Sequence, residues 1–143
     1  MSKIKKAHKR SKELCKGCTS CCEYVLIEID APKSKNDIDE LIWFLLHGIT
    51  IFIDSDDSWN LEIHNKCKVL NKKGKCSIYP IRPLVCKQYS HDECEKYKGK
   101  KYSKEKKIIN TVIEFLEYID NDPKLRKIKR VELFEKEFYK CFS

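Results

Sequence analysis

The residues most able to do chemistry are four cysteines near the start of the chain, in the stretch "CKGCTSCC" (residues 15–22). They form overlapping C-x-x-C units that end in an adjacent pair, Cys21 and Cys22. Three thiolates at this spacing can surround an iron–sulfur cluster, whereas zinc sites more often combine one C-x-x-C with a distant second pair. Adjacent side chains diverge in both strands and helices. Cys21 and Cys22 are therefore expected to face two different centres, or one of them ligates while its neighbour has another role.

Four further cysteines follow before residue 100. The predicted metal ligands are Cys15, Cys18, Cys21, Cys22, Cys67, Cys76, Cys86 and Cys94. Eight thiols divide evenly into two four-coordinate sites, which indicates two centres, or one cluster with an accessory site. The cofactor expected first is a [4Fe–4S] cluster, with zinc as the alternative or as a second metal. The spacing leaves open which cysteines share a centre.

The remaining candidate ligands have simpler expected roles. The ninth cysteine, Cys141, lies three residues after Phe138 on an apolar helical stripe, so we expect a small buried residue there rather than a ligand. His64 and His91 each precede a cysteine by three residues, but eight thiols are already sufficient, so both are expected at the surface or beside the ligands. No nucleophile–base–acid set is found. Catalytic residues are therefore not assigned, and enzymatic activity stays open.

Composition narrows the class of protein. The chain has 143 residues, nine of them cysteine, and no apolar run long enough to span a membrane. Its basic first residues lack the apolar middle of a signal peptide, so a cytoplasmic protein with reduced, metal-binding thiols is expected rather than a disulfide framework. The formal net charge is +8, but metal-bound thiolates would offset much of it, which leaves little support for nucleic acid as a partner. A protein or small-molecule partner, no membrane and an open oligomeric state are the expectations.

The predicted fold class is α+β: a small cysteine-rich module with short antiparallel hairpins, followed by a C-terminal helical hairpin. Its expected elements are a strand at 24–29 with Val25, Ile27 and Ile29 on one face, a helix over 38–45 that ends at Gly48, a hairpin of 49–53 and 59–64, and a tighter hairpin over 67–79 that turns at Lys73-Gly74. Pro80 and Pro83 rule out a regular element between them, so an ordered loop is expected to present Cys86.

From Ser103 onward the pattern changes to two amphipathic helices separated by "NDP". The first stripe consists of Ile108, Val112, Phe115, Leu116 and Ile119, and the second of Leu125, Ile128, Val131, Phe134 and Phe138. We therefore predict a cysteine module over 1–100 and a helical hairpin over 101–143 that packs on it, the two making a single domain.

The cysteine pattern resembles the YkgJ-type cysteine-cluster family of zinc- or iron-chelating domains, whose signature is CxxCxxCC. A second block, "CSIYPIRPLVC", is similar to the family's C-x-I-Y-x-x-R-P-x-x-C run, so Cys76, Ile78, Tyr79, Arg82, Pro83 and Cys86 carry over. The resemblance covers about residues 13 to 95 and implies metal binding through eight cysteines. Where the family usually has an arginine, this chain has Lys87, which keeps the charge but loses bidentate anion recognition.

Two residues of the second block have alternative interpretations. Arg82 would either bind an anion near the cluster or hydrogen-bond loop carbonyls and cysteine sulfurs, and we favour the structural role. Tyr79 is expected to pack rather than to transfer protons.

Three functions remain open at this stage. The first is an iron–sulfur protein with redox or methyl-transfer chemistry. A flagellin lysine methylase carries a similar cysteine block, but this short chain has no recognisable glycine-rich nucleotide loop. The second is a structural zinc module that binds nucleic acid or an acidic protein. The third is a metal store or chaperone with exchangeable metal.

Overall fold

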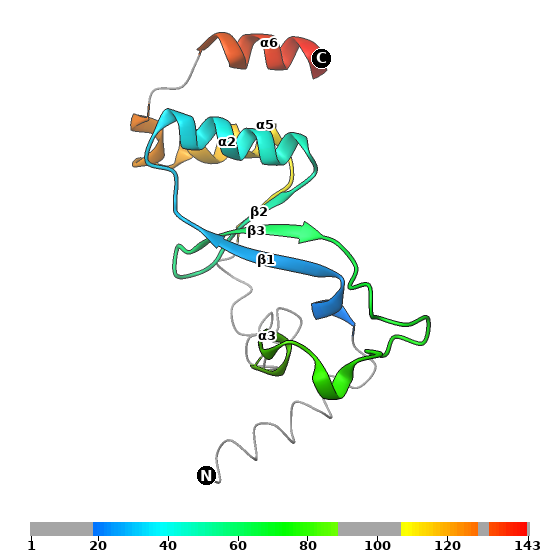
Figure 1. Cartoon of the computed structure of the whole chain (residues 1–143). Helices are drawn as coiled ribbons and strands as arrows, with labels where there is room; N and C mark the ends of the chain where they lie inside the picture. The colour runs from blue at the N-terminus through cyan, green and yellow to red at the C-terminus, as the bar shows by residue number, and fades with distance from the viewer. Residues whose placement is uncertain (1–18, 89–106, 129–131, 143) are drawn as a thin grey trace. The chain divides into compact units, whose positions relative to one another are not determined.

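The computed structural model describes residues 19–88, 107–128 and 132–142. In chain order, with η for a 3-10 helix, its elements are η1 (Ser20–Cys22), β1 (Tyr24–Ile29), α2 (Lys35–Leu46), β2 (Thr50–Ile53), β3 (Trp59–His64), η2 (Tyr79–Ile81), α3 (Leu84–Gln88), β4 (Lys107–Ile109), α5 (Val112–Asn121), η4 (Leu125–Lys127) and α6 (Glu132–Phe142). The strands form one antiparallel sheet in the order β1-β3-β2-β4. Together with the helices, this confirms the α+β class (Figure 1).

The chain divides into two compact units. The cysteine unit comprises Met1–Leu26 and Glu62–Lys106, and the core unit comprises Ile27–Leu61 and Lys107–Ser143. The division falls within β1 and β3. Each unit is therefore built from two separate stretches of chain.

Two capping boxes start the helices of the core unit. The Ser34 hydroxyl accepts a hydrogen bond from the backbone N–H of Asp37, whose carboxylate accepts one from the N–H of Ser34. Thr111 and Glu114 repeat this arrangement at the start of α5. These bonds satisfy N–H groups that the first turn of a helix leaves without partners. At the other end of α2, Gly48 takes φ 74°, as predicted for a residue after a helix C-terminus.

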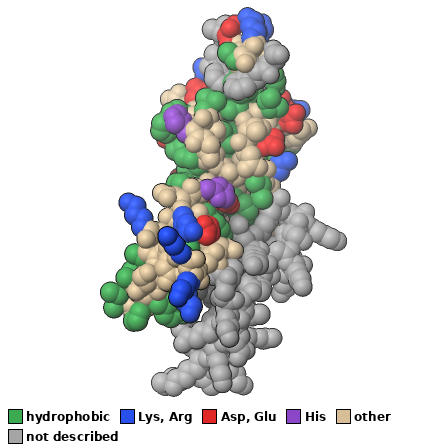
Figure 2. Space-filling model, turned by 90° about the vertical axis from the view of Figure 1, so that its right-hand side faces the viewer, with side chains coloured by type: hydrophobic (Ala, Val, Ile, Leu, Met, Phe, Trp, Pro, Cys, Tyr) green, Lys and Arg blue, Asp and Glu red, His purple; other side chains and the backbone are tan. Residues whose placement is uncertain are grey.

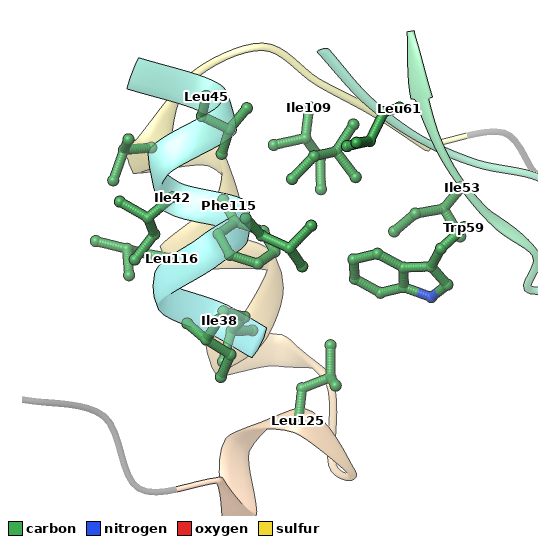
Figure 3. Packing of buried hydrophobic residues seen from close by; sticks show 14 residues of the cluster. Ile38, Ile42, Leu45, Ile53, Trp59, Leu61, Ile109, Phe115, Leu116 and Leu125 are labelled. Carbon is green, nitrogen blue, oxygen red and sulfur yellow. The ribbon is translucent and has the colours of Figure 1, made fainter. Parts of the chain in front are cut away.

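The core unit is held together by apolar packing among α2, α5 and the strands. Figure 3 shows Ile38, Ile42 and Leu45 of α2 around Phe115 and Leu116 of α5, with Trp59 nearby. The rings of Trp59 and Phe115 pack edge to face, with their centroids 6.5 Å apart. Strand β4 pairs antiparallel with β2, with Phe52 opposite Ile108. The predicted hairpin of β2 and β3 is confirmed, and its turn is closed by a bond from Asp54 N–H to Ser58 O of 3.0 Å.

The structure corrects two C-terminal expectations. Ile108 belongs to the short strand β4, not to the first helix, which begins only at Val112. Two adjacent β-branched residues favour a strand, and the capping box at Thr111 fixes where the helix starts. The second stripe begins with the 3-10 helix η4 rather than with an α-helix; Val131 lies outside the described residues.

The strand predicted at 24–29 is confirmed as β1. The three apolar residues expected on one face of it differ in burial. Ile29 packs against the core, whereas Val25 and Ile27 are exposed. Among the helices of the described ranges, none has both the length and the apolar character needed to cross a membrane.

Candidate metal centre

Five of the eight predicted ligands lie in the described part of the chain, and all five belong to the cysteine unit. They are Cys21, Cys22, Cys67, Cys76 and Cys86. All five are free thiols. Cys15, Cys18 and Cys94 lie outside the described residues. The structure therefore describes how the second cysteine block is arranged around the end of the first.

Two contacts join the end of the first block to the later hairpin. The backbone N–H of Cys67 donates to the carbonyl oxygen of Cys22 at 2.7 Å. At the hairpin turn, Gly74 has φ 71°, and a Cβ there would lie 3.2 Å from Cγ2 of Thr19. A side chain at Gly74 would thus meet both backbone strain and a close neighbour. Residues 45 and 55 positions apart are held next to each other at the candidate site.

The thiol of Cys22 lies within electrostatic range of three other described cysteines. Partial burial raises its pKa above the ordinary value, and the negative charges of Cys67, Cys76 and Cys86 raise this pKa further. A hydrogen bond from Cys21 to the Cys22 sulfur opposes this and lowers the pKa. Repulsion of this kind among thiolates is what a bound metal cation relieves.

A hydrogen bond joins the thiols of Cys21 and Cys22. It bears on the expectation that the two side chains face different centres. Cys21 is exposed and Cys22 is partly buried, but their side chains still reach each other. Both belong to the single 3-10 turn η1. Their divergence therefore does not put them out of reach of one centre.

The second hairpin is confirmed, but its register does not pair Cys67 with Cys76, which a hairpin over 67–79 was expected to bring together at its base. Its isolated bridge pairs Leu70 with Cys76, and Ser77 N–H donates to Val69 O. Cys67 precedes the paired residues, in a turn closed by a bond from Leu70 N–H to Cys67 O. The two cysteines are therefore not cross-strand neighbours, although both act on the pKa of Cys22.

Asn71 organises the tip of this hairpin and was not singled out in the sequence. Its Oδ1 accepts hydrogen bonds from the N–H groups of Lys73 and Lys75, at 2.9 and 3.0 Å. Asparagine is a common turn residue because its side chain can satisfy nearby backbone groups in this way. An asparagine at the head of "NKKGK" is thus a local signal for the turn.

Cys86 is presented by a short helix rather than by the expected loop. Pro80 lies in the first turn of η2, and Pro83 directly precedes α3. Both positions tolerate proline, because the first turn of a helix does not need the missing N–H. The two prolines therefore start short helices instead of preventing them.

Arg82 ties these two short helices together. Its Nη1 donates to the carbonyl oxygen of Tyr79 at 2.8 Å, and its Nε donates to that of Cys86 at 3.4 Å. The guanidinium carbon lies 3.9 Å from the centroid of the Tyr79 ring, a cation–π contact. Arg82 thus hydrogen-bonds backbone carbonyls, as the structural interpretation expected, and Tyr79 packs against it.

The other candidate ligands have different surroundings. His64 is exposed, its Nε2 lies 2.7 Å from Oε1 of Glu62, and its ring is near that of Tyr24. His91 lies outside the described residues. Cys141 is exposed on α6, so the expectation of a buried residue was wrong. The apolar stripe predicted its place on a helix, but not which side of that helix is covered.

The chemistry of the described donors fits a soft metal, since thiolates select iron–sulfur clusters and zinc. Among residues 19–88, 107–128 and 132–142, however, no three His, Cys, Asp or Glu side chains are grouped as ligands of one ion. In the part of the chain that the structure describes, the Cys22 thiol lies within electrostatic range of three other thiols, and backbone contacts hold their segments. The same part has no carboxylate set that would suit a harder cation.

Comparison with known proteins identifies one family. A family model described as "CxxCxxCC: Putative zinc- or iron-chelating domain" matches residues 14–132. No curated protein and no solved structure matches the chain. The match extends well beyond the two cysteine blocks, into the helices of the core unit. It supports metal binding, of zinc or iron, by the cysteine cluster.

Proposed function

We propose that this chain, which belongs to the CxxCxxCC family, holds an iron–sulfur cluster of the [4Fe–4S] type through its cysteine unit. The proposed ligands come from the same eight cysteines, Cys15, Cys18, Cys21, Cys22, Cys67, Cys76, Cys86 and Cys94. Support for iron–sulfur comes from the C-x-x-C-x-x-C spacing of the first block. A second metal would bind those of the eight thiols that do not ligate the cluster.

The observation that carries the proposal is a contrast in burial. The described residues of the cysteine unit, 19–26 and 62–88, contain no buried side chain. In the same residues, the Cys22 thiol lies within electrostatic range of Cys67, Cys76 and Cys86. Described residues that bury no side chain need another source of stability, such as a disulfide or a metal. Because these cysteines are free, thiolate–metal bonds are the source that fits.

The residues of the chain would hold the cluster. Arg82 fixes the backbone that presents Cys86. The backbone hydrogen bond from Cys67 N–H to Cys22 O joins the first block to the start of the hairpin that contains Cys76. A bound iron–sulfur cluster supplies electron-transfer chemistry, so redox chemistry is the role we propose, and methyl transfer supported by a cluster is its variant.

A structural zinc module is the second candidate, favoured by one feature of the site. Cys67 precedes the paired residues of the second hairpin, and Cys76 lies within them. Zinc sites often combine one C-x-x-C with a distant pair of cysteines, and Cys67 and Cys76 would supply that pair. In that case the function would lie in binding an acidic protein or a nucleic acid.

The deciding experiment is the content of metal and acid-labile sulfide in protein purified without oxygen, with its visible absorption spectrum. Iron and sulfide in matching amounts, in a brown protein, support the cluster. Zinc without sulfide in a colourless protein contradicts it and supports the structural module. Rapid loss of any metal to a mild chelator would instead indicate a storage or chaperone role.

A further inference from the structure

The segment that presents Cys86 exposes an unusual amount of apolar surface. Ile81, Leu84 and Val85 are 77%, 66% and 67% exposed. They lie within five consecutive positions, across the end of η2 and the start of α3. Single exposed apolar residues are normal, but clustered ones mark interaction sites. We call these three residues together with Arg82 and Lys87 the η2–α3 surface.

The described residues of the cysteine unit carry a strongly positive net charge. Residues 19–26 and 62–88 contain seven cationic side chains, Lys66, Lys68, Lys72, Lys73, Lys75, Arg82 and Lys87, and two carboxylates, Glu23 and Glu62. Glu62 already pairs with His64, and Glu23 accepts a hydrogen bond from Thr19. Figure 2 shows Lys and Arg side chains gathered close to hydrophobic ones in the lower part of the face it draws.

Neither cation of the η2–α3 surface has a carboxylate partner among the described residues. Arg82 uses two of its N–H groups on backbone carbonyls and keeps the rest for another acceptor. Metal-bound thiolates offset part of the local positive charge, and the metal's own charge restores some of it. The surface therefore combines aliphatic side chains with two cations that pair with no carboxylate of residues 19–88, 107–128 and 132–142.

We infer that the η2–α3 surface docks an acidic, apolar segment of a partner protein next to the metal-binding cysteines. Aliphatic side chains lose their contact with water against other apolar side chains, and the flanking cations match carboxylates. The inference is independent of which metal the cysteines hold.

Two other occupants fit less well. Single-stranded nucleic acids stack their bases on aromatic rings, but one face of the Tyr79 ring is covered by the Arg82 guanidinium, and Ile81, Leu84 and Val85 have no ring on which a base can stack. A second copy of the chain docked through the same surface would oppose two sets of like charges, which is unfavourable.

The test uses the full-length, metal-loaded protein and three fluorescent probes in anisotropy titrations. The first probe is a synthetic helical peptide with Leu on one face and Glu at the flanking positions. The second has Lys in place of every Glu, and the third is a polyuridine oligonucleotide of the same charge as the first. We expect the Glu peptide to bind more than about tenfold more tightly than either other probe, with an affinity that falls as salt rises.

Matched valine variants locate the binding. Val85→Ser is expected to weaken binding of the Glu peptide at least about fivefold, as truncation of a central interface residue does. Val25→Ser makes the same change at a valine of β1 that is 51% exposed, and should leave the affinity within about twofold. Val85 is adjacent to the proposed ligand Cys86. If Val85→Ser loses metal, Ile81→Ser takes its place in the test, because Ile81 is five residues away from both Cys76 and Cys86.

Several results would overturn the inference. Preference for the oligonucleotide would assign the surface to nucleic acid. Equal losses in Val85→Ser and Val25→Ser would mean that binding is not local. A concentration-dependent dimer that Val85→Ser abolishes would assign the surface to a second copy, and failure of the metal-loaded protein to bind the Glu peptide would indicate that no acidic partner docks there.

Discussion

The two units of this protein differ in how many apolar side chains their described residues bury. Every buried hydrophobic side chain of the described residues belongs to the core unit, whereas the described part of the cysteine unit has none and holds five free cysteines. Burial stabilises a fold by roughly 25 cal/mol per Å² of apolar surface, and metal binding stabilises one through its ligands. The comparison predicts that the two units respond to different perturbations.

Removing one ligand should have the largest effect, confined to the cysteine unit. Cys86→Ser is expected to lose metal and with it the order of this unit, since structural metal sites contribute about 10–16 kcal/mol to folding in small domains. The helical circular dichroism of the core unit should remain. Metal analysis and circular dichroism measure the two effects.

Cys141→Ser is the matched control, because Cys141 is an exposed cysteine on α6. It should keep full metal content. If it loses metal as Cys86→Ser does, the assignment of ligands is wrong; if Cys86→Ser keeps its metal, this cysteine is not a ligand.

A cavity in the apolar core should destabilise the core unit and leave the metal content of the cysteine unit unchanged. Phe115→Ala is expected to cost about 3–5 kcal/mol of unfolding free energy, because this side chain is fully buried against α2 and Trp59. Ile113→Ala, on the same helix but exposed, should change it by no more than about 0.5 kcal/mol. Urea unfolding reports both. A loss of metal in Phe115→Ala would mean that the units are not independently stabilised.

Substitution of Arg82 tests how much its hydrogen bonds and its contact with Tyr79 stabilise the metal site. Arg82→Ala removes two hydrogen bonds to backbone carbonyls and the contact with Tyr79, together worth about 1–2 kcal/mol. A chelator should then withdraw metal about five- to thirtyfold faster. Arg126→Ala, the same change in the core unit, is the control and should not alter the rate. Equal rates for Arg82→Ala and unchanged protein would show that the arginine does not hold the site.

The helix caps give a smaller effect, limited to the core unit. Thr111→Ala removes the hydroxyl that accepts from Glu114 N–H at 3.2 Å and should cost about 1 kcal/mol. Thermal unfolding of the two proteins measures the difference. Thr111→Ser, which keeps the hydroxyl, should recover most of it; a serine variant as unstable as the alanine one would contradict the capping role.

Acid should weaken the same cap. The backbone N–H of Asn110, at 2.7 Å, holds the pKa of the Glu114 carboxyl below its ordinary value. A carboxyl with a lowered folded-state pKa stabilises the fold above its unfolded pKa and loses this contribution as pH falls through the folded pKa. Stability should therefore decline below about pH 5, and less steeply in Glu114→Gln. Equal slopes in a pH series of unfolding would contradict this.

The sequence predicts the core unit well because its signals are local. The apolar spacing of Ile38, Leu41, Ile42 and Leu45 identifies α2, and all four are buried. Ser34 and Gly48 mark its two ends through capping and a positive φ. Ile108 was misplaced because an apolar residue just before a helix fits the helical stripe, and only pairing with β2 shows that it belongs to a strand.

The cysteine unit is harder to predict because its contacts are not local. Spacing alone identifies the thiols, but the bond between Cys67 and Cys22 and the approach of Gly74 to Thr19 depend on tertiary structure. Prolines were interpreted as helix breakers, although at Pro80 and Pro83 they start short helices. The sharing of eight cysteines among centres and the domain boundary at residue 100 stay predictions.

Hydrogen exchange before and after removal of the metal tests the central claim most directly. With metal bound, the N–H groups of Cys67 and Ser77 should exchange slowly, since both are hydrogen-bonded, and they should lose this protection when the metal is withdrawn. Amides of the core unit, such as that of Phe115, should keep their protection throughout. Equal loss in both units, or no loss at Cys67 and Ser77, would contradict a cysteine unit held by metal beside a core unit held by apolar packing.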